Sequence, residues 1–338
     1  MNDISEQATA SLLSVDGLSV EYGLKGVSFP AIQNVSFDLH AGESVALVGE
    51  SGSGKTTTAM AIAGLLSPNA QVSRGKVRYR GQELPIDDDT AMRPHRWSDI
   101  SVIFQGAMNA LNPVHRIAKQ IAEPCMLKLG LSHDQAMARA TELLELVGIP
   151  ADRGAAYPHQ LSGGMRQRVM IAMALACRPS IVIGDEPTTA LDVINQAQIL
   201  NLLVDLRSRL KLGLILITHD LSVVSESCDR VMIMYAGRIV EEGAVADIFA
   251  APKHPYTRLL IESIPNPARG KRELLPIPGD PPTLVKRPSG CAFNPRCPSA
   301  MTICTTEAPE LNGCGQGRVA CHLHPSSVTP GRKVAARV

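Results

Sequence analysis

The chain has 338 residues, of which 45% are hydrophobic and 19% are charged, with 33 Lys and Arg against 32 Asp and Glu. This composition belongs to a globular protein of one large domain or two ordinary ones, and excludes a disordered chain. The formal net charge of +1 argues against a protein held on nucleic acid mainly by bulk positive charge. No apolar run reaches the roughly 18 residues of a membrane helix, and the N-terminal MNDISEQATA lacks the features of a secretory signal.

The chain begins with two patterns that predict antiparallel strands, at Leu13–Tyr22 and Ile32–Leu39. Short apolar runs then predict strands that are buried on both faces, as in a parallel sheet. These runs are Ser44–Val48, Ser101–Phe104, Ile181–Gly184 and Leu214–Thr218. Helical patterns lie between them, so we expect an α/β domain around a mostly parallel sheet. A hairpin is expected at Arg230–Tyr235 and Arg238–Glu242.

The composition divides the chain into three parts. Residues 1–265 form the expected α/β domain, with a helical insertion at about 106–180 that includes Val114–Lys128 and Asp134–Val147. Residues 266–325 are rich in proline and then in cysteine, which predicts a small appended C-terminal module. We expect residues 326–338 to be a loose tail.

The strongest motif is GESGSGKT, from Gly49 to Thr56, which fits G-x-x-x-x-G-K-[ST] between an apolar strand and a helical pattern. Glycines let backbone N–H groups approach a polyphosphate, and the following helix directs its positive end at the same anion. Lys55 would contact the β- and γ-phosphates, and the Thr56 hydroxyl can bind Mg²⁺. The predicted binding residues are Gly49, Ser51, Gly52, Ser53, Gly54, Lys55, Thr56 and Thr57.

A second element is the apolar strand that ends in Asp185 and Glu186. It places two carboxylates at the carboxyl edge of the sheet, where open α/β folds bind their ligands. We expect Asp185 to hold Mg²⁺, directly or through water, and Glu186 to act as general base on the attacking water.

Further along, LSGGMRQR from Leu161 to Arg168 resembles the signature motif of ABC-type ATPases. Other motifs of that family match in order: Gln105 resembles the Q-loop, Ala190-Leu191-Asp192 the D-loop, His219 the switch histidine, and Tyr22 the aromatic residue that stacks on adenine. The resemblance covers roughly residues 12–265 and implies an ATP-hydrolysing cassette with an antiparallel β subdomain. It implies catalytic roles for Glu186, His219, Lys55 and Gln105, nucleotide contacts from Tyr22, Ser162, Gly163, Gly164 and Asp192, and Mg²⁺ contacts from Thr56, Gln105 and Asp185.

The resemblance also implies partners. In the family, two ATP molecules are held between two head-to-tail ATPase domains, and this chain carries one set of motifs, so a second identical or homologous ATPase subunit is expected. Two membrane permease subunits and an extracytoplasmic solute-binding protein complete such importers, with the ATPase peripheral on the cytoplasmic face of the cell membrane. The loop Gly106–Pro113 is expected to dock the permease through exposed apolar side chains such as Met108 and Leu111.

Five of the eight cysteines lie within the 31 residues from Cys291 to Cys321. Without an export signal, such a cluster favours a metal site over disulfides. The segment resembles the C-terminal extension of ATPase subunits from oligopeptide and dipeptide importers, in which Cys291, Cys297, Cys304 and Cys321 would be the ligands. Four thiolates suit both zinc and an iron–sulfur cluster, and the resemblance to this family favours a [4Fe–4S] cluster; zinc, a disulfide and free thiols are the alternatives.

We therefore predict an ATPase subunit of an ABC importer for dipeptides or oligopeptides. Relatives with the same extension import nickel complexes, opines or sugars, so a non-peptide cargo is the first alternative. A soluble ABC ATPase that acts on nucleic acid or ribosomes is the second. The chain has neither long heptad coiled coils nor a second set of motifs, so we expect no nucleic-acid partner.

Overall fold

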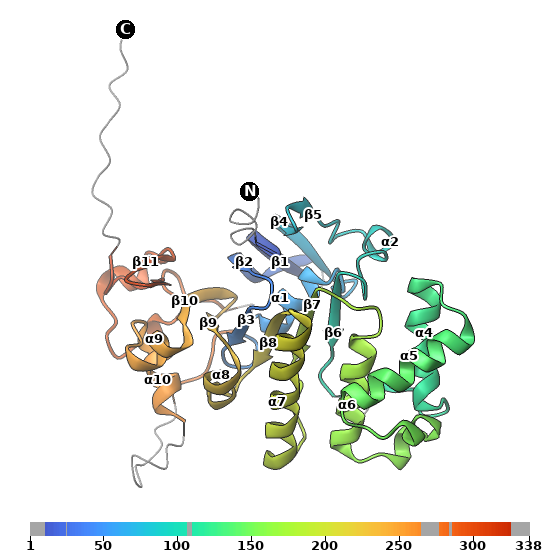
Figure 1. Cartoon of the computed structure of the whole chain (residues 1–338). Coiled ribbons are helices and arrows are strands. Elements are labelled where there is room, and N and C mark those ends of the chain that lie inside the picture. Colours follow the sequence, from blue (N-terminus) through green and yellow to red (C-terminus); the bar gives the residue numbers. More distant parts are fainter. Residues whose placement is uncertain (1–10, 25, 107–109, 265–276, 284–285, 326–338) are drawn as a thin grey trace, which may run out of the picture.

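The computed structural model describes residues 11–24, 26–106, 110–264, 277–283 and 286–325 (Figure 1). Four of the expectations above concern residues outside these ranges. They are the N-terminal sequence examined for a secretory signal, the domain boundary near residue 265, the loose tail, and Met108 of the docking loop.

An eight-stranded sheet forms the centre of the molecule, in the order β11-β12-β10-β9-β3-β8-β7-β6. The neighbours β9, β3, β8, β7 and β6 pair in parallel. The strands are β3 (Ser44–Val48), β6 (Ile100–Ile103), β7 (Ile181–Asp185), β8 (Gly213–Thr218), β9 (Arg230–Tyr235), β10 (Arg238–Ala244), β11 (Asn312–Cys314) and β12 (Gly317–Val319). Every residue of β3, β7 and β8 is buried, as the continuous apolar runs predicted.

A second, antiparallel sheet lies beside the first, in the order β2-β1-β4-β5. Its strands are β1 (Leu13–Leu24), β2 (Val27–Leu39), β4 (Ala70–Tyr79) and β5 (Gln82–Glu83). Buried residues alternate along β1, so one face of this sheet packs on the core that it shares with β3 and β8. The two antiparallel strands expected at the start of the chain are confirmed, and both are longer than their apolar patterns.

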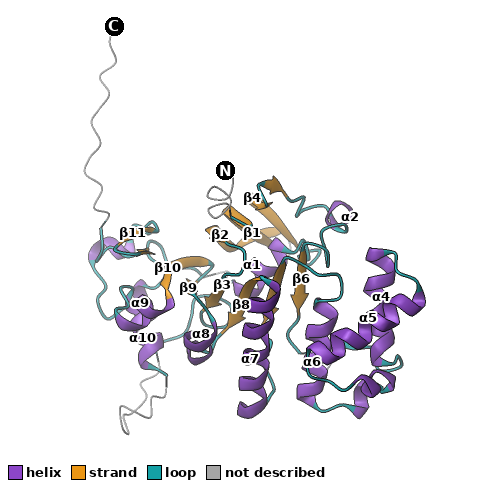
Figure 2. Cartoon of the chain, viewed as in Figure 1, coloured by secondary structure: helices purple, strands orange, loops and turns teal. Residues whose placement is uncertain are grey.

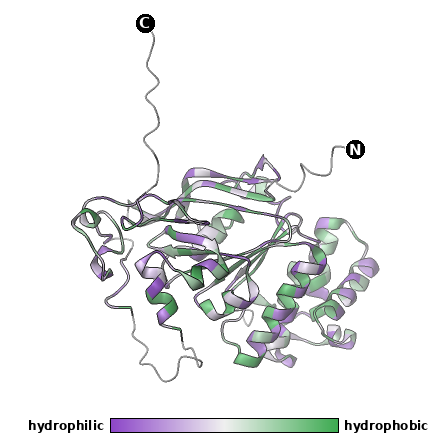
Figure 3. Ribbon diagram, turned by 60° about the vertical axis from the view of Figure 1, so that its left-hand side comes forward, coloured by the Kyte–Doolittle hydropathy of each residue, from purple (hydrophilic) through white to green (hydrophobic). Residues whose placement is uncertain are grey.

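Helices surround the central sheet, and three of them form a separate group on the side of β6 (Figures 1 and 2). The helices are α1 (Lys55–Ile62), α2 (Asp89–Met92), α4 (Ile117–Leu129), α5 (His133–Leu146), α6 (Gly163–Ala174), α7 (Val193–Leu210), α8 (Leu221–Ser227), α9 (Val245–Ala250) and α10 (Pro255–Glu262), with short 3₁₀ turns η1 (Ala151–Ala155), η2 (Pro158–Gln160), η4 (Asn294–Arg296) and η5 (Thr302–Thr305). The group α4, α5 and α6 has an apolar core of its own, continuous with one face of β6 and β7. Hydrophobic and hydrophilic residues are interspersed in this group of helices (Figure 3), and α4 and α5 are amphipathic.

The expectation of an exposed Leu111 is wrong. Its side chain is only 3% exposed and belongs to the core of the helical group. Among the described large apolar side chains near this loop, Phe104 and Val114 are exposed instead, at 42% and 72%. None of the described helices is long and apolar enough to cross a membrane.

The C-terminal segment, which comprises the described residues 277–283 and 286–325, packs on the α/β core. Strand β12 extends the central sheet by antiparallel pairing with β10, where Val319 lies opposite Glu241. Phe293, which is 1% exposed, packs edge-on against Tyr235 of β9 with ring centroids 5.1 Å apart, and against Tyr256 of α10 at 5.3 Å. Aromatic pairs in this geometry contribute beyond the area they bury. The segment and the ATPase-like core therefore share one hydrophobic cluster.

This shared cluster predicts that Phe293→Ala will destabilise the whole chain. The lost contacts and the cavity left behind should lower the free energy of unfolding by about 3–5 kcal/mol. Urea unfolding followed by circular dichroism measures this change. Leu323→Ala is the control, because Leu323 is 42% exposed. An unchanged midpoint for Phe293→Ala would contradict a common core.

Candidate functional site

The carboxyl ends of the parallel strands bring the predicted site residues to one edge of the central sheet. Gly49 follows β3, Gln105 lies just beyond β6, Glu186 follows β7 and His219 follows β8. Because β3, β8, β7 and β6 are neighbours in that order, the four residues line up along the edge. The site is thus assembled by sheet topology from residues that are far apart in sequence.

The phosphate-loop motif forms a turn that only glycine can make at two positions. A Cβ atom on Gly49 would lie 2.2 Å from the carbonyl oxygen of Met234, and Gly54 has φ +103° with Ile32 packed beside it. Gly54 is also the N-cap of α1, where no side chain accepts a hydrogen bond from the first N–H groups. The Ser53 hydroxyl is buried without a partner among the described residues. Open N–H groups at a helix start and an unpaired hydroxyl fit a bound polyphosphate.

Lys55 lies inside this turn. Its Nζ donates to the carbonyl oxygens of Gly49 at 2.7 Å and Glu50 at 2.9 Å. Burial lowers the pKa of Lys55, while the nearby carboxylates of Glu186, Asp185 and Glu50 oppose that shift. The loop carbonyls therefore hold the Lys55 ammonium group within the turn, where it can contact a bound phosphate.

Thr56 and Asp185 supply two oxygen ligands at one point. The Thr56 hydroxyl donates to Asp185 Oδ1 at 3.1 Å, across 129 residues of sequence. Burial raises the pKa of Asp185, and the hydrogen bond from Thr56 opposes the shift. A hydroxyl and a carboxylate beside a phosphate loop are a donor set that suits Mg²⁺, which would neutralise phosphate charge when bound.

Glu186 is the centre of the hydrogen-bond network at the sheet edge. Its carboxylate accepts hydrogen bonds from Gln105 Nε2 at 2.9 Å and from Thr189 Oγ1 at 2.9 Å, and Oε1 lies 3.1 Å from His219 Nδ1. Burial by itself would raise the pKa of Glu186, but the hydrogen bonds from His219 and Thr189 outweigh it, so the pKa lies below its usual value. The group is therefore ionised at neutral pH and able to accept a proton from water.

The backbone at Glu186 is strained. Its φ of +46° lies in the left-handed region, which is costly for a residue other than glycine. Its N–H donates to Ile217 of β8 at 2.9 Å, which holds the conformation against the sheet. In this conformation the carboxylate bonds to Gln105 and His219.

Thr189 is a site residue that the sequence motifs did not predict. It lies three residues after Glu186 in a turn whose N–H at Thr189 donates to the Glu186 carbonyl at 3.1 Å. This turn brings the Thr189 hydroxyl within hydrogen-bond distance of the Glu186 carboxylate. A serine or threonine three residues after a strand-end carboxylate is the signal that could have identified it.

The signature segment lies at the start of α6, with Ser162 as its N-cap. The Ser162 hydroxyl accepts from Met165 N at 3.3 Å, and a Cβ on Gly164 would clash at 2.5 Å with Asn195 Oδ1. Asn195 in turn bonds to Asp192, the N-cap of α7, through its N–H at 3.0 Å. The structure thus brings Ser162, Gly164 and Asp192 together. Among the residues described, no hydrogen bond links this group to the phosphate loop of the same chain.

Tyr22, the residue predicted to stack on adenine, lies on strand β1. It is half-buried on β1, opposite Phe29 of β2 and Ala70 of β4. No hydrogen bond joins Tyr22 to the phosphate loop within the part of the chain that the structure covers. Its predicted stacking role needs none, and stays a prediction.

The four predicted cysteine ligands gather in the C-terminal segment. Burial raises the pKa of Cys291 to about 11, and Cys304, Cys321 and Cys297 add to the shift because their thiols are close. Nevertheless, no group of three or more His, Cys, Asp or Glu side chains in the described ranges is arranged to hold a metal ion. The predicted metal site is therefore not supported.

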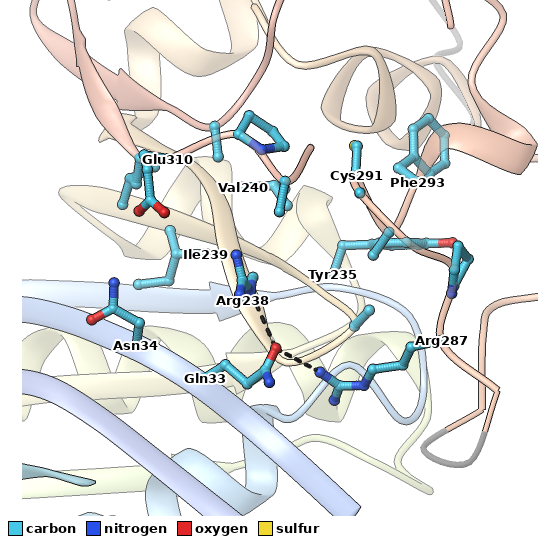
Figure 4. A pocket seen from close by; sticks show the side chains of 18 residues that line it. Gln33, Asn34, Tyr235, Arg238, Ile239, Val240, Arg287, Cys291, Phe293 and Glu310 are labelled. Atoms are coloured by element: carbon cyan, nitrogen blue, oxygen red, sulfur yellow. Dashed lines mark hydrogen bonds between the residues drawn. The ribbon is translucent and has the colours of Figure 1, made fainter. Parts of the chain in front are cut away.

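A cavity of about 310 Å³ lies between β2, the β9–β10 hairpin and the C-terminal segment (Figure 4). Gln33 Oε1 accepts hydrogen bonds there from Arg238 Nε at 3.3 Å and Arg287 Nη1 at 3.1 Å. None of the phosphate-loop residues lines this cavity.

Comparisons with known proteins agree with this geometry. Residues 32–189 match the family model described as ABC transporter, and residues 240–304 match the model described as oligopeptide/dipeptide transporter, C-terminal region. The chain is 46% identical to the dipeptide transport ATP-binding protein DppD of Haemophilus influenzae, over 92% of this chain and 95% of the relative. It is 44% identical to the oligopeptide transport ATP-binding protein OppD of Salmonella typhimurium, over 95% of this chain and 98% of the relative.

Solved structures show the same fold. The dimeric structure of the ATP-binding cassette MJ0796 bound to ADP and Pi is similar with a TM-score of 0.62 and 28% identity, covering 69% of this chain and 98% of that one. The structure of cbiO1 from Clostridium perfringens, part of the ABC transporter complex cbiONQ, has a TM-score of 0.63 at 27% identity, over 71% of this chain and 91% of that chain.

The hydrogen bond from Thr189 predicts a pH effect. Because it lowers the pKa of Glu186, Thr189→Val should raise that pKa, and the acidic limb of the kcat profile for ATP hydrolysis should move to higher pH. Profiles recorded with the same nucleotide compare the variant with the wild type. Thr141→Val on α5, whose hydroxyl bonds to Met137, is the control. A shift to lower pH would show that the proton acceptor is not Glu186.

Proposed function

The chain belongs to the ABC transporter ATP-binding family, in its dipeptide and oligopeptide branch, and from this premise we propose that it energises peptide import across a membrane. Its activity is ATP hydrolysis. The observation that carries the proposal is the convergence of Gln105, Thr189 and His219 on Glu186, next to the phosphate loop.

The proposed chemistry assigns one role to each group at the sheet edge. Lys55 and the loop N–H groups bind the β- and γ-phosphates of ATP, and Thr56, Asp185 and Gln105 are the residues that would hold Mg²⁺, which supplies charge neutralisation. Glu186 accepts the proton of the attacking water, because it is ionised and aimed at the edge. His219 contacts the γ-phosphate and orients Glu186.

We propose that Ser162, Gly163 and Gly164 serve the ATP of a second ATPase subunit, identical or homologous. The start of α6 is a helix terminus with glycines, which suits a phosphate, and no hydrogen bond ties it to this chain's own loop among the residues described. Beside it, Val193 and Ile194 are 79% and 72% exposed at the start of α7. Adjacent exposed apolar side chains favour a surface that another subunit covers. Asp192 lies between the start of α6 and the start of α7.

We propose that two permease subunits dock on the helical group, with an extracytoplasmic solute-binding protein delivering the cargo. The cassette would then be peripheral on the cytoplasmic face of the membrane. Phe104 and Val114, exposed next to Gln105 and α4, are the apolar side chains that support a docking role for this region. Contact there would reach Glu186 through the hydrogen bond from Gln105.

We also propose that Cys291, Cys297, Cys304 and Cys321 bind a [4Fe–4S] cluster, with zinc as the alternative. The proposal rests on the spacing of the four cysteines in the sequence. In the structure Cys291 N donates to the Cys304 carbonyl at 2.9 Å, but the described side chains are not arranged as a metal site. Cys314 lies apart on β11, where Lys253 bonds to its carbonyl.

The central test is Glu186→Gln in the assembled importer. Removing the proton acceptor should lower kcat for ATP hydrolysis by about 10² or more and abolish peptide uptake, while Mg-ATP still binds. Glu226→Gln, on the exposed face of α8, is the control and should retain both activities. Undiminished turnover in Glu186→Gln would exclude Glu186 from this role. Rapid uptake of other solutes in place of peptides would show that the transported cargo is not a peptide.

The cluster proposal predicts absorbance at about 400 nm and about four irons per chain in anaerobically purified protein. Cys304→Ser should lose both, and Cys314→Ser should keep both. Zinc without iron, or equal spectra for the two variants, would contradict a cluster bound by the four named thiols.

A further inference from the structure

An ion pair links the C-terminal segment to the phosphate loop. Arg296, the last residue of η4, donates from Nη1 to Glu50 Oε2 at 2.6 Å and from Nη2 to Oε1 at 3.0 Å. Glu50 is the residue after Gly49 in the phosphate-loop motif, 246 positions earlier in the chain. Two parallel N–H···O bonds between a guanidinium and a carboxylate fix both orientation and distance.

The guanidinium group of Arg296 makes two further hydrogen bonds. Its Nε donates to the Pro278 carbonyl at 2.8 Å, and Nη1 also reaches the Tyr235 hydroxyl at 3.2 Å. The side chain is 5% exposed, against 25% for Glu50, and the guanidinium lies 5.8 Å from the centroid of the Tyr235 ring. Arg296 is thus a fixed support, and Glu50 is the group that it holds.

Glu50 is also tied to the ATP site through its backbone. Its N–H donates to the buried Tyr256 hydroxyl at 2.9 Å, and its carbonyl oxygen accepts from Lys55 Nζ. The hydrogen bond from Lys55 Nζ to the Glu50 carbonyl, at 2.9 Å, places Glu50 directly beside the ammonium group. A carboxylate next to a polyphosphate site repels the ligand and attracts the lysine that should bind it, unless another cation neutralises it.

We propose that Arg296 is a positioning residue for ATP: it holds and neutralises the Glu50 carboxylate, which would otherwise compete with the phosphates for Lys55. The inference rests on the proposed nucleotide site. It gives the C-terminal segment a direct part in ATP binding, separate from any metal. Removing Arg296 should therefore weaken ATP binding, and removing the Glu50 charge as well should restore it.

The test measures KM and kcat for ATP, together with Mg-ATP affinity by calorimetry, in the full-length chain within its complex. Arg296→Met should raise KM by about tenfold with little change in kcat at saturation, because the freed carboxylate is an internal competitor. The double variant Glu50→Gln/Arg296→Met should return KM to within about twofold of the wild type. A merely structural Arg296 predicts a double variant at least as impaired as the single one.

Two further variants complete the design. Arg318→Met is the matched control, because Arg318 anchors the same segment to Glu242 of β10 at 2.7 Å and, among the described residues, makes no hydrogen bond to the phosphate-loop motif. Its KM should stay within about twofold. If Arg296→Met does not fold, Glu50→Gln alone decides, because loss of the adverse charge should leave KM unchanged or lower.

The outcomes separate the two proposals. Failure of the wild type to bind Mg-ATP would overturn the proposed function. Normal ATP binding by the wild type, with an unchanged KM in Arg296→Met or no recovery in the double variant, would overturn the role of Arg296 alone. A raised KM in Glu50→Gln would do the same.

Discussion

Parallel pairing of β3, β8, β7 and β6 is the constraint on which the site depends. The carboxyl ends of parallel strands meet at one edge, so each strand can end in a functional residue and the sheet alone brings them together. Gly49, His219, Glu186 and Gln105 reach the edge in this way. The strained backbone at Glu186 and the glycine turn at Gly49 follow directly on buried strands and form part of this edge.

The C-terminal segment is held by the same core that carries the site. Phe293 fills the space between Tyr235 and Tyr256, and β12 continues the central sheet beyond β10. Through Arg296 the segment also reaches the phosphate loop. The part of the chain that matches the C-terminal family model, residues 240–304, therefore contacts the phosphate-loop motif directly.

The sequence predicted those parts of the fold and site that are local. Apolar runs located β3, β7 and β8, since strands buried on both faces have an unmistakable pattern, and the phosphate loop depends on a contiguous motif. Leu111 was misjudged because an apolar residue in a loop carries no sign of whether it faces solvent or core. The pairing of Arg296 with Glu50 joins residues 246 positions apart, and only the folded chain reveals it. The thiols show the opposite limit: spacing indicated ligands, but the described side chains are not arranged as a metal site.

The central claim is that ATP binds at the sheet edge through the turn from Gly49 to Thr57, with Lys55 as its main cation. Isothermal titration of Mg-ATP into the wild type and Lys55→Met tests it most directly. We expect one nucleotide per wild-type chain and an affinity at least about a hundredfold lower for Lys55→Met, or about 2.7 kcal/mol. Equal affinities for the two proteins would contradict it.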